Sequence, residues 1–285
     1  MHAAVITVPA FASARDGVRH FFGTRRHADS LALDLGVPAR QSGAQGRGWL
    51  LSVKQVHGTD ALVVDRPLTE SDQFHGGWDA LVTDQPGVTV AVRTADCVPV
   101  LVHDPRRRVV ASIHAGWRGA VAGIVSKTLT LMADRFGSTR SDLRVSIGPS
   151  AGVCCYEVDD AVLDHLRVGV PDWESVVHDY RGHKARLDLK TLIRRQVEGE
   201  GVSAPSVSAV NLCTICHDKL FYSYRREGRV NGTMVSGITL LSHRWEPVRV
   251  CALTFARRFL YNTSQLPRDG VSQNPRATGT IEPAV

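Results

Sequence analysis

The chain has 285 residues, of which 43% are hydrophobic and 22% are charged, a composition typical of a soluble globular protein. The formal net charge of +6 comes mostly from arginines scattered along the chain, without the dense basic block of a nucleic-acid-binding protein, so we expect no nucleic-acid partner. No run of about 18 apolar residues occurs, so the sequence predicts no membrane-spanning helix and no membrane partner.

Residues 1–14 are expected to form a lead-in to the main domain. Their apolar run is followed by Ala-Ser-Ala, which is similar to a signal-cleavage site, but no Lys or Arg precedes the run and Pro9 interrupts it. We therefore interpret the run as a first strand and expect a cytoplasmic protein. The six cysteines are too few for a disulfide scaffold and are expected to be reduced.

Short apolar runs alternate with turn residues through most of the remaining chain. The pattern predicts strands over 49–56, 60–65, 88–93, 98–103, 108–113, 143–147, 207–212 and 234–241. It predicts helices over 119–136, 158–168 and 188–199. Strands so often joined by hairpins favour a single α/β (α+β) domain, placed at 15–243. Residues 244–285 are rich in Pro, Ser, Thr, Gly and Arg, and we expect this C-terminal tail to be partly disordered.

The stretch RTADCVPVLVHDPRRRVVASIHAGWRG contains a thiol and an imidazole at opposite ends of a predicted hairpin. A turn centred between Pro105 and Arg106 pairs Cys97 with His114, with Cβ atoms about 4.5–5.5 Å apart. One zinc ion spans that gap, because it binds sulfur at about 2.3 Å and imidazole nitrogen at about 2.1 Å. His57, just before Gly58, is the best third ligand.

One cysteine and two histidines leave the fourth position of tetrahedral zinc open, as in catalytic zinc sites, where the ion lowers the pKa of water to about 7. Two alternatives remain open. Cys97 and His114 are also typical of buried core residues. They equally fit a metal-free cysteine hydrolase or amidase, with Cys97 as the nucleophile and His114 as its base.

The segment Ala-Gly-Trp-Arg-Gly after His114 leads into the predicted helix 119–136. A glycine-rich helix entry exposes backbone N–H groups, and Arg118 adds a forked cation suited to phosphate. The segment therefore indicates an anion-binding site beside the metal candidate. The alternative is an ordinary glycine-lined helix start.

Two further motifs are weaker guides to chemistry. Cys213-Thr-Ile-Cys216-His217 matches a haem attachment pattern, but haem attachment needs export. We favour a local structural thiol pair; a redox pair also remains open, whereas a four-cysteine zinc site would need a second cysteine pair. Gly148-Pro-Ser150-Ala-Gly152 matches a nucleophile elbow, but no helix is predicted after it, which disfavours a serine hydrolase.

Five segments of the chain resemble one known family. They read QVHGTD, WDALVTDQPGVTVAVRTADCVPVLVHDP, ASIHAGWRGAVAGIV, IGPSAGVCCYEV and LCTICHDKLFYSYRREG. They are similar to the laccase-domain family, formerly described as multicopper polyphenol oxidases and now regarded as purine nucleoside phosphorylases. The resemblance covers residues 18–243 and is most specific over Trp78–Val125.

The resemblance implies one cytosolic α/β domain, a layered sandwich of mixed β-sheets flanked by helices. It implies a zinc site made of the histidine of QVHG, the cysteine of TADC and the histidine of HAGWRG, which are His57, Cys97 and His114 here. It also implies phosphorolysis of adenosine, inosine and S-methyl-5'-thioadenosine to the base and ribose 1-phosphate, with phosphate as co-substrate. Adenosine deaminase activity is implied as well.

Two departures from the family pattern and the histidine spacing refine this hypothesis. The family's TRxGGxS stretch reads Thr-Arg25-Arg26-His27-Ala-Asp-Ser here and lacks the glycine pair, which bears on the substrate range. The cysteine segment lacks the proline that often precedes the Cys pair. Multicopper clusters need His-x-His pairs, and none of the twelve histidines lie two residues apart, so Zn²⁺ is favoured over copper.

On this hypothesis His57, Cys97 and His114 are the catalytic and metal-binding residues. The candidates for binding substrate or phosphate are Arg25, Gln55, Arg118 and Gly119. Arg93 and Asp96 are expected to position Cys97, and His75 and Asp79 are further candidates for a general acid or base. A third hypothesis, from another class, is a non-catalytic editing factor for cell-wall synthesis. The sequence carries no signal for oligomeric state.

Overall fold

The computed structural model describes residues 5–11, 17–28, 38–43 and 46–242. The predicted C-terminal tail of 244–285 lies outside the described residues. The prediction of a strand in the N-terminal apolar run is confirmed at Val5–Ile6, which forms β1.

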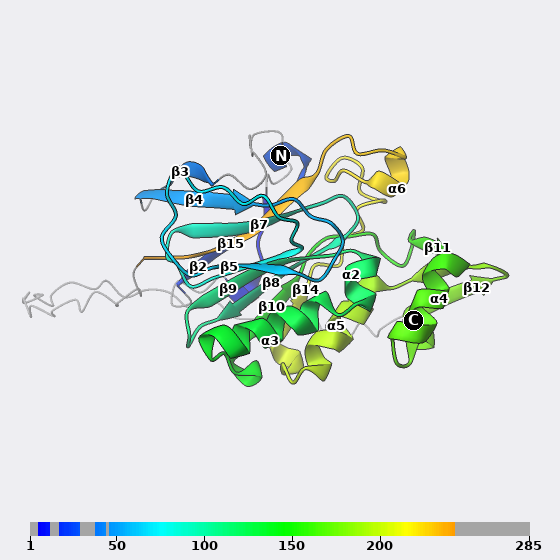
Figure 1. Cartoon of the computed structure of the whole chain (residues 1–285). Helices are drawn as coiled ribbons and strands as arrows, with labels where there is room; N and C mark the ends of the chain where they lie inside the picture. Colours follow the sequence, from blue (N-terminus) through cyan, green and yellow to red (C-terminus); the bar gives the residue numbers. More distant parts are fainter. Residues whose placement is uncertain (1–4, 12–16, 29–37, 44–45, 243–285) are drawn as a thin grey trace, which may run out of the picture. The chain divides into compact units, whose positions relative to one another are not determined.

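Two six-stranded mixed sheets form the body of the described chain (Figure 1). The first has the order β1-β2-β15-β7-β4-β3. Its other strands are β2 Val18–Gly23, β3 Ala39–Gly43, β4 Gly46–Ser52, β7 Val88–Thr94 and β15 Met234–Leu240. Neighbouring strands are antiparallel except β4 and β7, which are parallel.

The second sheet has the order β14-β10-β8-β9-β6-β5. Its strands are β5 Ala61–Val64, β6 Ala80–Thr83, β8 Val98–Asp104, β9 Val109–Ala115, β10 Arg144–Ile147 and β14 Val207–Ala209. The β5–β6 and β10–β14 pairs are parallel. Strands β8 and β9 are buried along their whole length, which explains their continuous apolar runs.

A small third sheet has the order β11-β13-β12, and its strands flank α4 along the chain. The helices are α1 Arg25–Ala28, α2 Trp117–Val121, α3 Ile124–Phe136, α4 Asp160–Gly169, α5 Leu189–Gly199 and α6 Tyr224–Glu227. The small sheet contains β11 Glu157–Asp159, β12 Val177–Arg181 and β13 Lys184–Leu187. Short 3-10 helices occur at Pro9–Phe11, Arg140–Asp142, Trp173–Val176 and Ala204–Ser206.

Two hydrophobic cores lie on the two faces of the second sheet. On β8, Val100 faces the core that contains Leu129 of α3 and Ile193 of α5. Its neighbour Leu101 faces the other core, together with Leu51 of the first sheet. This alternation along one strand gives a layered arrangement of sheet, sheet and helices (Figure 1). The predicted fold class is confirmed.

The predicted helix over 119–136 is two helices. Gly123 separates α2 from α3 and has a left-handed backbone with φ of +80°. A glycine adopts this conformation without steric cost, so the chain changes direction there although the apolar spacing continues. The strand predicted over 49–56 ends at Ser52, before His57.

The hairpin of β8 and β9 has a different register from the predicted one. Pro99 pairs with His114, and Asp104 pairs with Val109, so Cys97 does not lie directly opposite His114. The predicted pairing is wrong because the turn contains four residues, 105–108, instead of two.

A side-chain cap explains the longer turn. One carboxylate oxygen of Asp104 accepts hydrogen bonds from the backbone N–H groups of Arg106 and Arg107, both at 2.9 Å. Cys97 therefore lies two positions before the partner of His114. Cys97 lies in the bend just before β8, and despite the shifted register its sulfur stays within 4.8 Å of a ring nitrogen of His114.

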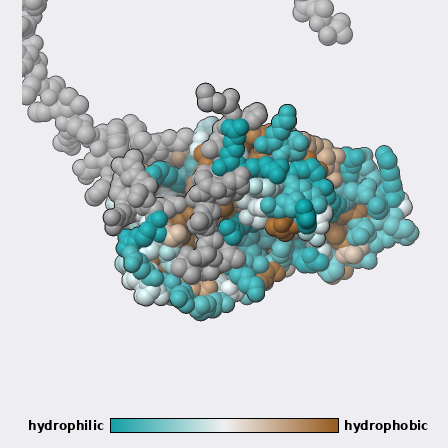
Figure 2. Space-filling view, turned by 90° about the horizontal axis from the view of Figure 1, so that it is seen from above, coloured by the Kyte–Doolittle hydropathy of each residue, from teal (hydrophilic) through white to brown (hydrophobic). Residues whose placement is uncertain are grey.

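Among the described residues, no helix combines the length and the apolar character needed to cross a membrane. The face seen in Figure 2 is largely hydrophilic, and hydrophobic residues occur on it in small separate areas.

Candidate active site

Three side chains from separate segments converge near the C-terminal ends of β7 and β9. His57 follows β4, Cys97 lies in the bend between β7 and β8, and His114 is near the end of β9. Their ligand atoms all lie within 4.8 Å of one another. The sulfur of Cys97 is 3.9 Å from Nε2 of His57, and the two imidazole rings meet edge to face. The structure thus brings together the three residues that the sequence singled out.

Asp79 holds two of these side chains in place. It is fully buried, and its carboxylate accepts a hydrogen bond of 2.7 Å from Nδ1 of His114. The same carboxylate accepts the backbone N–H groups of His57 at 2.9 Å and Gly58 at 2.6 Å. His57 has a positive φ of +60°, a conformation that these hydrogen bonds stabilise. Asp79 is therefore a positioning residue for both histidines.

The charges of the site favour a thiolate. Burial opposes ionisation of Cys97, but hydrogen bonds from His114 and His57 outweigh it and lower the pKa of the thiol to about 6. Burial likewise opposes protonation of His114, and hydrogen bonds with Asp79 and Cys97 raise the pKa of its imidazole to about 9. The carboxylate of Asp79 and the thiolate of Cys97 thus stabilise the imidazolium form of His114.

The three side chains fit a zinc ion. Tetrahedral coordination by one thiolate and one imidazole requires a sulfur–nitrogen separation of about 3.6 Å, close to the 3.9 Å between Cys97 and His57. His114 uses Nδ1 to bond Asp79, which leaves Nε2 available for a metal. The backbone also leaves space, because a Cβ atom on Gly116 would lie 3.0 Å from both the Cys97 sulfur and the His57 ring.

A cavity of about 770 Å³ opens over the three side chains. This size lies within the range of small-molecule sites. Aromatic and cationic side chains share its wall: Trp117, Tyr156, Tyr224, Arg93, Arg118 and Arg225. Burial raises the pKa of Tyr156 to about 12, so its hydroxyl stays protonated and can donate a hydrogen bond at neutral pH.

The candidates for binding substrate occupy different places. Arg118 lines the cavity with its guanidinium 4.5 Å above the Trp117 ring. Gln55 also lines the cavity, but both ends of its amide bond the backbone of Arg93, at 2.7 and 2.8 Å. Gly119 allows α2 to approach the loop after His57, because a Cβ there would lie 2.9 Å from the Gly58 carbonyl oxygen.

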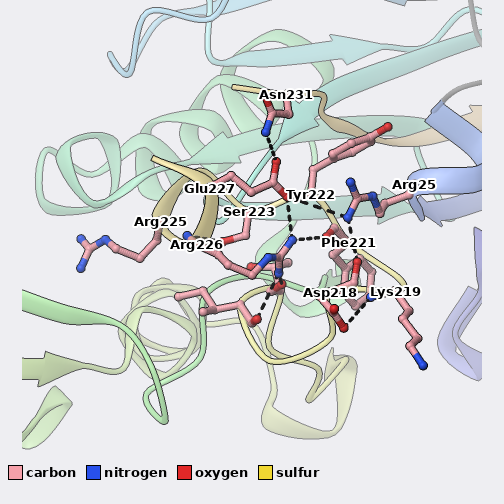
Figure 3. A network of polar contacts seen from close by, with 12 residues as sticks. Arg25, Asp218, Lys219, Phe221, Tyr222, Ser223, Arg225, Arg226, Glu227 and Asn231 are labelled. Carbon is pink, nitrogen blue, oxygen red and sulfur yellow. Dashed lines mark hydrogen bonds and ion pairs between the residues drawn. The ribbon is translucent and has the colours of Figure 1, made fainter. Parts of the chain in front are cut away.

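Arg25 is not among the residues that line this cavity. Its guanidinium donates to the carbonyl of Asp218 at 2.9 Å, stacks on Tyr222 and lies 3.9 Å from Glu227 (Figure 3). In the same view Arg225 points away from this network. A role for Arg25 in binding phosphate stays a prediction.

Arg93 and Asp96 both border Cys97. Arg93 lines the cavity, and within the described residues its Nε is buried without a hydrogen-bond partner. Asp96 accepts hydrogen bonds from the hydroxyl groups of Thr214 at 2.6 Å and Ser223 at 3.0 Å, and from the backbone N–H of Arg225 at 2.7 Å. Asp96 thereby attaches the segment before Cys97 to the cavity wall.

The other acid–base candidate, His75, is exposed and bonds Gln73 at 2.9 Å, away from the cavity lining. Sequence reasoning assigned no role to Tyr156, Tyr224 or Arg225. The segments CCYEV and FYSYRREG contained the available signal, but nothing in their local pattern indicates that they face a cavity lined by Arg93, Cys97 and His114.

The chain matches the model of the multi-copper polyphenol oxidoreductase laccase family over residues 37–241. The chain belongs to this family. The matched part of this laccase-family chain contains the three converging side chains, Asp79 and the whole cavity lining, whereas Arg25 precedes it.

Relatives of this laccase-family chain include proteins named for nucleoside chemistry. A purine nucleoside phosphorylase of Clostridium acetobutylicum is 37% identical over 188 residues, which are 65% of this chain and 75% of that protein. Adenosine deaminase RL5, from an unknown prokaryotic organism, is 32% identical over 215 residues, 73% of this chain and 79% of that protein. The crystal structure of YlmD from Geobacillus stearothermophilus matches with a TM-score of 0.70 and 30% identity, covering 85% of this chain and 97% of that one.

Proposed function

We propose that this protein is a zinc-dependent purine nucleoside phosphorylase that also deaminates adenosine. Its substrates would be adenosine, inosine and S-methyl-5'-thioadenosine, each cleaved with phosphate to the base and a ribose 1-phosphate. The observation that carries the proposal is one cavity wall that combines the His57–Cys97–His114 group with aromatic side chains and arginines. The printed names of the relatives support it.

His57, Cys97 and His114 would hold the zinc ion. When bound, zinc supplies a Lewis acid that polarises an oxygen atom in the cavity. Asp79 keeps the His114 ring oriented through Nδ1 and holds the loop of His57 through backbone N–H groups. The polypeptide thus holds two imidazole rings and one cysteine sulfur at positions that suit a metal ion.

Arginines are the candidates to hold phosphate. Arg118 and Arg225 line the cavity, as does Arg93, whose buried Nε has no hydrogen-bond partner in the part of the chain that the structure describes. A guanidinium binds phosphate through two parallel N–H bonds, which fixes the nucleophilic oxygen as well as neutralising its charge. We propose that these side chains hold phosphate against C1' of the ribose.

Aromatic side chains are the candidates to hold the purine. Trp117 and Tyr224 offer ring faces on which a base can stack. The protonated hydroxyl of Tyr156 can donate a hydrogen bond to the base, whose ring nitrogens accumulate negative charge as the glycosidic bond breaks.

One observation favours a second candidate function. The lowered pKa of Cys97 and the raised pKa of His114 resemble a thiolate–imidazolium pair, which is the resting state of a cysteine nucleophile. A metal-free cysteine hydrolase or amidase would retain activity in chelator and lose it on alkylation of Cys97.

The deciding experiment incubates purified zinc-loaded protein with adenosine, with and without phosphate, and separates the products. Adenine and ribose 1-phosphate are expected only when phosphate is present, and inosine is expected from deamination. His57→Ala and chelator should abolish both reactions. If the zinc-loaded protein turned over no purine nucleoside, the proposal would be wrong.

A further inference from the structure

A second group of metal-ligating side chains lies outside the catalytic triad. The sulfur atoms of Cys154, Cys155, Cys213 and Cys216 all lie within 4.8 Å of one another. The first pair belongs to the loop between β10 and β11, and the second pair to the loop between β14 and α6. We call these four residues the cysteine cluster.

Backbone pairing holds the two loops side by side. Ser150 and Cys213 form an isolated parallel bridge, and the N–H of Thr214 donates to the carbonyl of Ser150 at 3.0 Å. The loops are thus fixed to each other just beside the sulfur atoms. The convergence of the cysteines follows from this pairing rather than from contacts among the thiols themselves.

The sulfur spacing suits a single tetrahedral ion. The sulfur of Cys216 lies 3.5 Å from that of Cys154 and 3.2 Å from that of Cys155. A disulfide bond is about 2.05 Å long. The edge of a zinc–tetrathiolate tetrahedron is about 3.8 Å, given zinc–sulfur bonds of about 2.3 Å. Both distances are somewhat shorter than the tetrahedral edge and well above the length of a disulfide bond.

Backbone donors surround the buried member of the cluster. The N–H of Gly152 donates to the sulfur of Cys213 at 3.2 Å. The N–H groups of Ile215 and Cys216, in the turn between the second pair of cysteines, hydrogen-bond the same sulfur. Such donors stabilise a thiolate and orient it, as the groups around a metal ligand do.

Basic side chains balance the charge that four thiolates would bring. Lys190 donates to the carbonyl of Leu212 at 2.8 Å, and its ammonium group interacts electrostatically with the sulfurs of Cys213 and Cys154. Arg186 donates to the carbonyl of Cys154. Zinc with four thiolates has a net charge of −2, so two neighbouring cations lower the cost of placing it there.

We propose that the cysteine cluster binds one structural Zn²⁺ ion, separate from the metal of the His57–Cys97–His114 site. Soft thiolate ligands in a tetrahedron select zinc, and four protein ligands leave no position for substrate. Cys154 and Cys216 are exposed, which gives the ion access from solvent.

The ion would connect one loop that lines the active-site cavity to a second loop that leads into α6, whose Tyr224 and Arg225 line it. Tyr156, which lines the cavity, directly follows Cys155. Thr214, between Cys213 and Cys216, donates to Asp96, which precedes Cys97. Arg226 of α6 adds a clamp by donating to the carbonyls of Thr214 and Ile215 (Figure 3). Zinc in the cluster would therefore fix the position of residues that line the cavity without lying in the cavity itself.

The test compares zinc per chain in the full-length wild type and in Cys213→Ser/Cys216→Ser, by elemental analysis and native mass spectrometry. The variant should carry one zinc fewer than wild type. Cys97→Ser, the same chemical change in the catalytic triad, should keep the cluster zinc. Equal zinc in wild type and the double variant would overturn the proposal, as would iron in place of zinc. The readout is metal content, so a failure of the proposed phosphorylase activity leaves it unaffected.

A second measurement covers the case in which the cysteine variant does not fold. His57→Ala/His114→Ala leaves the cluster intact and removes two ligands of the other site. X-ray absorption at the zinc edge should then show four sulfur neighbours at about 2.3 Å. A shell containing nitrogen, the absence of zinc, or disulfide-linked peptides from native wild type under non-reducing conditions would contradict the proposal.

Discussion

The carboxylate of Asp79 and Nδ1 of His114 are 2.7 Å apart, and both side chains are buried. Asp79 precedes β6, and His114 lies at the adjoining end of β9, which pairs with β6 in the second sheet. A backbone hydrogen bond joins the same two residues, since the N–H of His114 donates to the carbonyl of Asp79 at 2.7 Å. The histidine is therefore fixed at both its main chain and its ring.

Asp79→Asn should weaken zinc binding about 10- to 100-fold, the range found when a partner of a metal-ligating histidine is removed. The amide keeps the shape of the Asp79 side chain but loses the negative charge that favours a proton on Nδ1 of His114. Competition with a chromophoric chelator measures the affinity. Asp65→Asn, which alters an exposed pair with Arg135, is the control and should leave the affinity unchanged. Equal affinities in the two variants would contradict the assigned role of Asp79.

Gly116→Ala should disturb the metal site directly. The added Cβ would lie 3.0 Å from the Cys97 sulfur and from the His57 ring, so one of the two ligands must move. We expect loss of zinc together with at least a tenfold loss of phosphorolysis, about 1.4 kcal/mol. In Gly199→Ala the added Cβ meets no atom of the described residues within 4 Å, so this variant should behave as wild type. Full zinc content in Gly116→Ala would show that the site has more room than the structure indicates.

Arg118→Ala should raise the KM for phosphate about 10- to 100-fold, because hydrogen bonds to a charged group contribute about 1.5–3 kcal/mol. Arg25→Ala removes a guanidinium that bonds Asp218 outside the cavity lining, so we expect a smaller effect on that KM. Steady-state kinetics at varied phosphate concentration separates the two. A larger effect in Arg25→Ala would move the phosphate site toward the N-terminal segment.

Cys97 should react with iodoacetamide in metal-free protein with a midpoint near pH 6. The thiolate is the reactive form, so the rate rises with pH through the folded pKa, about 2.5 units below that of a free cysteine. His57→Ala removes one hydrogen bond to the thiolate and should move the midpoint upward. Peptide mass spectrometry reports labelling at Cys97 specifically. A midpoint near pH 8.5 would mean that the histidines do not stabilise the thiolate.

Strand and helix positions were largely predictable because apolar periodicity reports burial directly. β7, β8, β9 and β15 are each buried along nearly their whole length and stood out as segments rich in apolar residues. The small sheet of β11, β12 and β13 did not stand out. β12 is mostly exposed, and its sequence VHDYR has a single aliphatic residue, which gives no apolar period.

The site was only partly predictable, since local pattern does not show which loops meet. His57, Cys97 and His114 were found through the hairpin and the family motifs, although the register was wrong by two positions. Asp79 was predicted only as a candidate acid or base; its contacts with the two histidines were not visible in the sequence, because those partners lie 22 and 35 residues away along the chain. The cysteine cluster was missed for the same reason: each pair is ordinary in sequence, and only the Ser150–Cys213 bridge places them together.

The Asp104-capped turn of residues 105–108 has a consequence for tolerance to insertion and deletion. Its tip lies at the end of the hairpin opposite to Cys97 and His114, so the turn can change length without touching the site if Asp104 still pairs with Val109. A slip of one residue between β8 and β9 would instead present the neighbours of His114, Ile113 or Ala115, to the metal ligands. Length variation among natural or engineered homologues should thus accumulate at this tip, while the strand pairing behind it stays invariant.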